Sequence, residues 1–386
     1  VQSYEDKVRI TAQLIKASPE SLLWSGSYDD DQKDVLTLIN EVTQSIAKEI
    51  EIKLSPAEER RLGSAYSVNP DAYRLYLHGR YHWNKRTPES IAKSIEFFQQ
   101  AIEADLALAP AYSGLADAFA LFGSLEYGVY PPKEIMPKAK EAALTAVRLD
   151  PSLAEAHTSL ANIRLFYDWD WEAAKREFEK AIELNPNYAT AHHWFANYFV
   201  VVGKLNEARK EIKKALDLDP NSLVINTDVG WIYQHSRKYD EAIAQIQSTL
   251  KLEPNFIQAH LALGFAYCLQ NKHEEAIQSF QTARKLSNGY PLSIAALSYA
   301  LAISEQESQS LELLDQLNEI SMEQYIPALY FALIHMGLGN NDRAFEWIDK
   351  AIQERSAYLA YFAVDPKLDR LRSNPRFSEV IRRIGL

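Results

Sequence analysis

Residues 257–286 read IQAHLALGFAYCLQNKHEEAIQSFQTARKL, and this stretch decides the fold. The small residues Gly264 and Ala276 let two antiparallel helices approach each other closely. Large residues at 263, 267 and 280 fill the space beside them. The stretch therefore predicts a pair of packed helices, which we call helix A and helix B.

The pattern recurs along the chain with a period of 34 residues. The alanine of helix B is repeated at Ala174, Ala208, Ala242, Ala276 and, after Ser310, at Ala344. A large residue of helix A is repeated at Phe195, Val229, Leu263, Leu297 and Phe331. Pro186, Pro220 and Pro254 keep the same spacing, and each ends a helix B because proline lacks a backbone donor and restricts the residue before it. A fixed period of this length predicts a solenoid of stacked helix pairs.

With Leu263, Gly264, Tyr267, Ala276 and Phe280 at these spacings, the chain resembles the tetratricopeptide repeat. The resemblance implies an all-α, right-handed superhelix of about eight repeats over residues 71–356. The tail 357–386 contains DPKLDRLRSNPRFSEVIRRIGL, which is expected to form a terminal helix that covers the last apolar face. Three repeats depart from the pattern. The second carries a long loop GSLEYGVYPPKEIMP, the third has one extra residue around YDWDWE, and the seventh, 291–322, is degenerate.

The first seventy residues differ from the repeats. Alternating apolar residues predict a strand over 7–17, and a second strand is expected over 22–28, with a turn at Ser18–Glu20. The aspartates at 29–31 are expected to cap a helix that runs to residue 50, and Ser55–Glu58 resembles a capping box that opens a linker helix over 55–70. The strings VRITAQLI and LLWSGSYDDD resemble the N-terminal domain of TolB, which precedes the repeats in some bacterial regulators. Residues 1–54 are therefore expected to be a truncated α/β fragment of that domain, and the chain is expected to be part of a longer protein.

Composition and charge exclude several classes of function. The net charge of −11 disfavours binding to nucleic acid, because an acidic surface repels phosphates. The single cysteine, Cys268, excludes a disulfide framework and a zinc site built on several cysteines. The sequence has no run of 18 consecutive apolar residues, so it predicts no membrane span. We expect a cytoplasmic location, and a periplasmic one if a signal or anchor lies upstream.

Motifs for catalysis are absent from the sequence. It contains no phosphate-binding loop, no nucleophile elbow and no zinc-protease helix. His192 and His193 point to different faces of one helix, so packing rather than metal binding is expected for His192. We therefore expect no catalytic residues, no cofactor and no metal.

The concave surface is the candidate binding site. In tetratricopeptide repeats it is lined by helix A, and the resemblance places there Thr158, Asn162, His193, Asn197, Thr227, Trp231, Gln234, His235 and Phe265. Amides and aromatics mixed in this way suit an extended peptide, because amides bond its backbone and aromatics hold its side chains. The lysine that clamps a C-terminal carboxylate is replaced by Thr158 or His193, so no carboxylate clamp is expected. The alternative is that the groove is solvated or filled by the chain's own end.

The predicted function is a protein-interaction scaffold or sensory module within a larger bacterial regulator, with a protein or peptide as partner. Self-association stays open. Two alternatives remain: the regulatory half of a class III adenylate cyclase, or an assembly scaffold in the cell envelope.

Overall fold

The computed structural model describes residues 2–4, 7–17, 20–31, 42, 45 and 69–386. Three strands open the chain: β1 (Gln2–Tyr4), β2 (Lys7–Ala17) and β3 (Glu20–Asp31). They pair antiparallel in the order β1-β2-β3, with an irregularity between Leu14 and Ile15. The predicted strand over 7–17 is confirmed. The second strand is longer than predicted, so residues 29–31 belong to β3 rather than to a helix cap.

Most of the remaining N-terminal predictions lie outside the described residues. The helices expected over 32–50 and 55–68 fall there almost entirely, apart from Val42 and Ser45. The resemblance of this segment to the TolB domain therefore stays a prediction.

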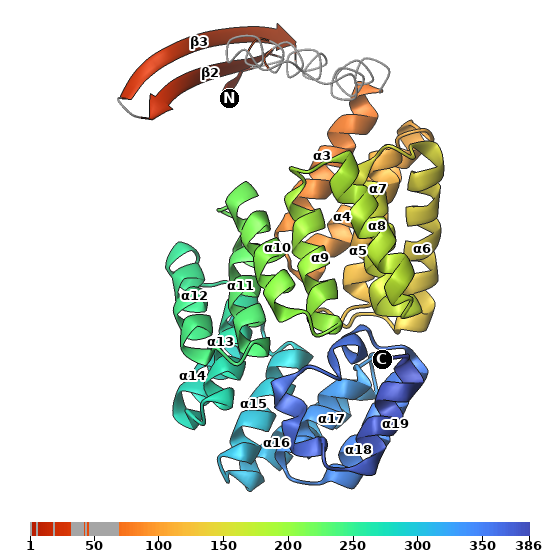
Figure 1. Ribbon diagram of the computed structural model, residues 1–386, viewed down its shortest axis with the longest axis vertical. Coiled ribbons are helices and arrows are strands. Elements are labelled where there is room, and N and C mark those ends of the chain that lie inside the picture. The colour runs from red at the N-terminus through yellow and green to blue at the C-terminus, as the bar shows by residue number, and fades with distance from the viewer. Residues whose placement is uncertain (1, 5–6, 18–19, 32–41, 43–44, 46–68) are drawn as a thin grey trace.

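Eight antiparallel helix pairs form the rest of the fold up to residue 354, which confirms the predicted all-α repeat superhelix (Figure 1). The pairs are α3 (Pro70–Asn84) with α4 (Pro88–Ala104), α5 (Ala109–Phe122) with α6 (Pro132–Leu149), α7 (Ala154–Ile163) with α8 (Trp171–Leu184), α9 (Ala189–Val201) with α10 (Leu205–Leu218), α11 (Leu223–His235) with α12 (Tyr239–Leu252), α13 (Ile257–Leu269) with α14 (His273–Leu286), α15 (Pro291–Ile303) with α16 (Glu307–Ser321), and α17 (Ala328–Gly337) with α18 (Asn341–Glu354). Residues after α18 form two short 3-10 turns, η4 (Ala357–Tyr361) and η5 (Pro366–Leu371), and a last helix, α19 (Pro375–Ile384).

Close packing inside each pair explains the residues that recur. Phe280 on α14 is fully buried, and a β-carbon at Gly264 on α13 would lie 2.4 Å from its Cε1. Likewise, a β-carbon at Gly230 on α11 would lie 2.5 Å from Cγ1 of Ile246 on α12. The helical glycine is therefore required by the large residue on the facing helix, because no other side chain fits between the two backbones.

The extra residue of the third repeat is absorbed by one wide helical turn. Residues Arg164–Asp168 form a π turn, η3, at the end of α7, and Trp169 follows in the left-handed region with φ 55°. A π turn is the usual result of inserting one residue into an α-helix. It leaves the carbonyls of Tyr167 and Asp168 available, and both accept hydrogen bonds from Arg355, at 2.9 and 3.0 Å.

The loop in the second repeat is shorter than predicted. It covers residues 123–131, because Pro132 occupies the first turn of α6, where proline is well tolerated. The loop reaches the eighth repeat: the hydroxyl of Tyr330 donates to the carbonyl of Leu125 at 2.5 Å. At Gly128, with φ 40°, a β-carbon would lie 2.6 Å from Cγ of Pro327. The second and eighth repeats are therefore in direct contact.

The C-terminal segment completes this closure. Helix α19 lies against α18, and its Phe377 ring stacks at 4.7 Å on the ring of Phe362, which follows η4. The end of the chain also reaches the third repeat, because Nε1 of Trp171 donates to the carbonyl of Gly385 at 2.9 Å. In Figure 1 the blue C-terminal elements accordingly lie beside the green helices of the third and fourth repeats. The superhelix is thus a closed ring of repeats.

We expect Gly264→Ala to destabilise the protein. Overfilling a packed core costs about 1–3 kcal/mol, whereas alanine gains about 1 kcal/mol over glycine in a helix. Denaturant unfolding measures the balance. Gly264→Ala combined with Phe280→Leu should recover part of the loss, because the second change removes the ring edge that the new methyl group meets. A single variant more stable than the wild type would contradict the packing argument.

Candidate functional site

The ring of repeats encloses a chamber of about 440 Å³. Its walls come from the concave helices, from the loop 123–131 and from the segment 357–368. The chamber is lined by Arg86, Glu89, Glu126, Tyr127, Asn162, Phe166, His193, Trp194, Asn197, Thr227, Asp228, Trp231, Gln234, Gln258, Phe265, Tyr290, Tyr330, Tyr358, Tyr361, Asp365 and Lys367, among others. A volume of this size and a largely apolar wall with several aromatic residues are typical of small-molecule sites.

Most of the residues predicted for the groove do line the chamber. They are Asn162, His193, Asn197, Thr227, Trp231, Gln234 and Phe265. Thr158 and His235 do not. The hydroxyl of Thr158 donates back to the carbonyl of Ala154 at 2.8 Å, and Nδ1 of the buried His235 lies 3.1 Å from the carbonyl of Trp231. Burial lowers the pKa of His235 to about 4, so its ring is neutral near pH 7.

Trp231 packs against the chain's own end. Its ring lies 4.8 Å from that of Tyr361 and 4.0 Å from that of His235. The ring of Tyr361 also lies 5.5 Å from Phe166. The concave face is therefore partly filled by η4, as the alternative in the sequence analysis described. An extended peptide cannot follow the whole groove while Tyr361 occupies this position.

Sequence reasoning missed the lining residues that come from outside helix A. Glu126 and Tyr127 belong to the loop 123–131, while Tyr358 and Tyr361 belong to η4. The unusual length of the loop was the one available signal, since a loop of that size in a compact repeat is often functional. Its destination depends on the curvature of the whole ring, which no local pattern encodes.

Several polar groups of the chamber are satisfied by their neighbours. His193 pairs with Asp228 at 2.6 Å. Lys367 pairs with Asp365 at 2.9 Å and also donates to the hydroxyl of Tyr358. Burial alone would raise the pKa of Asp365, but the Lys367 charge holds it below its usual value.

Asn197 stands apart from these groups. Its residue is 9% exposed, and its Oδ1 accepts no hydrogen bond from any residue that the structure describes. A buried amide oxygen in this state is costly unless a ligand or water satisfies it.

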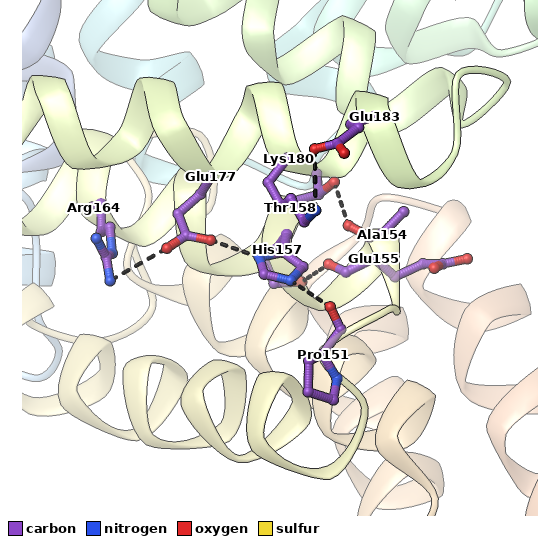
Figure 2. Close-up of polar contacts among 10 residues, drawn as sticks. Pro151, Ala154, Glu155, His157, Thr158, Arg164, Glu177, Lys180 and Glu183 are labelled. Atoms are coloured by element: carbon purple, nitrogen blue, oxygen red, sulfur yellow. Dashed lines mark hydrogen bonds and ion pairs between the residues drawn. The ribbon is translucent and has the colours of Figure 1, made fainter. Parts of the chain in front are cut away.

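Two other histidines of helix A, His157 and His192, join neighbouring repeats. Nδ1 of His157 lies 2.6 Å from Glu177, and its Nε2 lies 3.0 Å from the carbonyl of Pro151, which ends the preceding helix B (Figure 2). His192 repeats the arrangement with Glu211 and Pro186, at 2.6 and 2.9 Å. The position is therefore a polar bridge between repeats, whereas packing alone was expected for His192.

The fifth repeat builds the same bridge from amides. Nδ2 of Asn226 donates to the carbonyl of Pro220 at 2.9 Å, and Nε2 of Gln245 donates to Oδ1 of Asn226 at 3.2 Å. The bridge thus has a charged version and a neutral version in one chain.

Catalytic and metal chemistry gain no support from the described residues. Within 69–386 and the strands, His, Cys, Asp and Glu side chains nowhere gather in threes that could hold a metal ion. Burial raises the pKa of Cys268 to about 12, so its thiol stays protonated and unreactive near neutral pH. In the described part of the chain, every helix is too short or too polar to reach across a bilayer.

Residues 230–291 match the family model described as tetratricopeptide repeat, and helices α9, α11, α13 and α15 begin 34 residues apart. The helix pairs of this chain therefore form a superhelix of tetratricopeptide repeats. Among solved structures, the human IFIT1 dimer with m7Gppp-AAAA is similar, with a TM-score of 0.54 and 16% identity over 82% of this chain and 77% of that one. Identity this low shows a shared fold alone.

Four curated proteins match part of this chain, and three of them are HilA from different Salmonella sources. A putative adenylate cyclase 3 of Rhizobium meliloti is 27% identical over 161 residues, which are 42% of this chain and 27% of the relative. The transcriptional regulator HilA of Salmonella typhimurium is 26% identical over 138 residues, which are 36% and 24% of the two chains. The matches thus span about a quarter of the length of these relatives.

We expect Tyr361→Ala to open the tetratricopeptide-repeat ring at a cost of about 3–5 kcal/mol, because it removes the buried ring between Phe166 and Trp231. Amide hydrogen exchange should accelerate in residues 357–371 and in η3, and should stay slow in α14. Tyr81→Ala is the control, since Tyr81 is 59% exposed. Unchanged exchange in 357–371 would show that Tyr361 does not hold the closure.

We expect the His157 bridge to make stability depend on pH. The hydrogen bond to Glu177 raises the pKa of His157 above its ordinary 6.5, so the stabilisation is complete below pH 6.5 and is lost as pH rises through the folded-state pKa. Burial alone would raise the pKa of Glu177, but His157 and Arg164 hold it below its ordinary 4.5. That contribution is present above pH 4.5 and is lost as pH falls through the lowered pKa.

The bridge should therefore contribute most between about pH 4.5 and 6.5, by roughly 1–2 kcal/mol. The double variant His157→Asn, Glu177→Gln copies the neutral bridge of the fifth repeat and should lack this dependence. Unfolding free energies measured from pH 4 to 9 compare the two proteins. Parallel pH profiles would show that the bridge does not titrate.

Proposed function

We propose that this chain is a sensory module of a larger bacterial signalling protein, and that it binds a small molecule in its chamber. The observation that carries the proposal is the closure of the repeats around that chamber. The tetratricopeptide repeat is an interaction fold, and here most of the predicted groove residues line a partly enclosed chamber. Such a volume fits a small ligand better than an extended chain.

The same closure suggests how binding is transmitted. The chamber wall combines the first two repeats, the sixth and eighth repeats, and the C-terminal segment. A ligand that contacts all of these parts favours the closed ring over any opened form, because it binds only the state that assembles the wall. Partner proteins would then recognise the closed conformation by binding the outer surface of the ring, at the convex helices or at an attached domain.

The relatives support a regulatory role. One is named as an adenylate cyclase and the other as a transcriptional regulator, and each is about four times longer than the part that matches. In the proposal, an effector of one of these kinds is attached to this chain. The alternative of a cell-envelope scaffold has no such relative, and the chamber gives a scaffold no evident use.

Nucleic acid is a poor candidate for the chamber. IFIT1 is solved with RNA, but here the lining residues Glu89, Glu126, Asp228 and Asp365 outnumber Arg86 and Lys367. Phosphates are repelled by such a surface.

We expect Asn197→Leu to weaken the binding of the ligand by about 1–3 kcal/mol. The same change should leave the ligand-free protein at least as stable, since Oδ1 of Asn197 has no hydrogen bond to lose with any described residue. Asn226→Leu is the matched control on the next helix A. It breaks the bridge to Pro220, so it should lower stability without changing affinity.

The measurement is a thermal-shift titration with the small-molecule fraction and the macromolecular fraction of a host extract. Ligand binding raises the melting temperature by mass action. Stabilisation by the small-molecule fraction, reduced in Asn197→Leu, supports the proposal. Stabilisation by the macromolecular fraction alone would refute it and favour a protein partner.

A further inference from the structure

Two charged groups of the chamber form no ion pair with any residue in the described part of the chain. The first is Arg86, which follows α3, has a φ of 56° and is 8% exposed. Its guanidinium lies 3.5 Å above the ring of Trp83. It forms no ion pair with any residue that the structure describes, and its Nε has no hydrogen-bond partner there. Arg80, six residues earlier on α3, shows the ordinary arrangement, since it pairs with Asp117 at 3.1 Å.

A buried guanidinium without a counter-charge is unusual. Buried charges are normally paired, because desolvation is costly. The face of Trp83 offsets part of this cost through a cation–π contact, but it satisfies none of the N–H donors. A planar fork of donors that lines a cavity is well suited to a carboxylate, which it binds through two parallel hydrogen bonds.

The second group is Glu126, in the loop 123–131. Its carboxylate lines the chamber and remains accessible there, and it has no ion-pair partner among the described residues. Desolvation raises the pKa of Glu126 above its usual value, whereas hydrogen bonds from its own backbone and from Ser124 lower it. Arg86 and Glu126 line the same chamber, and among the described residues no ion pair joins them.

The position of Glu126 is fixed from both sides. The carbonyl of Leu125 accepts from Tyr330 at 2.5 Å, and the hydroxyl of Tyr127 accepts from Gln258 at 3.0 Å. Nε2 of Gln258 also donates to the carbonyl of Arg86, at 2.9 Å. One side chain thus connects the backbone of Arg86 with the residue beside Glu126, so both charged groups are held by a preorganised frame.

The other charges of the chamber do not change this pattern. Asp228 already shares a hydrogen bond with His193, and Asp365 forms an ion pair with Lys367. Glu89 lies in the first turn of α4, is exposed, and is stabilised by the N-terminus of that helix. One guanidinium and one carboxylate therefore remain for a ligand.

We propose that the ligand of the chamber is a free amino acid, whose carboxylate pairs with Arg86 and whose ammonium group pairs with Glu126. This inference rests on the proposed sensory function. The aromatic wall, which includes Trp231, Tyr290 and Tyr361, favours an apolar or aromatic side chain on the ligand. A ligand with a single charge would leave one of the two groups unpaired.

The test begins with a thermal-shift assay of the full chain against each of the twenty standard L-amino acids. At least one apolar or aromatic member should raise the melting temperature in a saturable manner. Calorimetric titration then compares that amino acid with its decarboxylated amine and its deaminated acid. Each analogue should bind at least about tenfold more weakly, because the amine leaves Arg86 without its partner and the acid leaves Glu126 without its partner.

Two variants assign the charges to the ends of the ligand. Glu126→Gln should weaken binding of the amino acid about tenfold or more. In this variant the amino acid should bind no more tightly than the deaminated acid. In Arg86→Gln, the amino acid should bind no more tightly than its decarboxylated amine. Melting of the ligand-free variants reports on folding separately, and Glu126→Gln is isosteric at an accessible position, so it keeps the test open if Arg86→Gln is unstable.

The outcomes separate this inference from the sensory function. If no amino acid stabilises the chain while the small-molecule fraction of the extract does, the chamber binds another class of ligand and the amino-acid assignment is wrong. If the amine binds as well as the amino acid, Arg86 does not hold a carboxylate and the assignment is also wrong. If neither the extract nor any amino acid stabilises the chain, the sensory function itself is contradicted.

Discussion

The closed form of this protein depends on the contact of Tyr361 with Phe166 and Trp231. These three rings belong to the C-terminal segment, the third repeat and the fifth repeat. A solenoid ordinarily contacts only its neighbours along the chain, so its stability is a sum of local terms. The Tyr361 contact adds a term between distant repeats. Arg355 and Trp171 reinforce it through hydrogen bonds to the backbone of the opposite side.

Two irregularities of the repeat pattern make this closure possible. The inserted residue of the third repeat becomes the π turn η3, whose carbonyls receive Arg355. The enlarged loop of the second repeat reaches Tyr330 and Gln258. A strictly regular array would have neither the free carbonyls of η3 nor the enlarged loop. Departures from the period are therefore the features that turn an open interaction surface into an enclosed chamber, and they carry the proposed function.

The chamber also explains why polar residues are spread over helix A. Some of them serve the fold: His157 and His192 bridge neighbouring repeats, and Thr158 bonds its own helix. Others, such as Asn197, retain hydrogen-bonding capacity that the protein does not use. The two kinds look alike in the sequence. They differ only in whether the side chain points toward the preceding proline or toward the centre of the ring.

The sequence by itself determined the helix pairs, their number and their close packing, because small and large residues at a period of 34 encode contacts that are local in the chain. It also placed Asn162, Asn197 and Trp231 on the concave side, since position within a repeat sets direction. Only the tertiary structure decided that Tyr361, Arg86 and Glu126 meet in one chamber. Small rotations between successive repeats accumulate over the whole superhelix, and their sum, which no single repeat contains, brings the two ends of the array together.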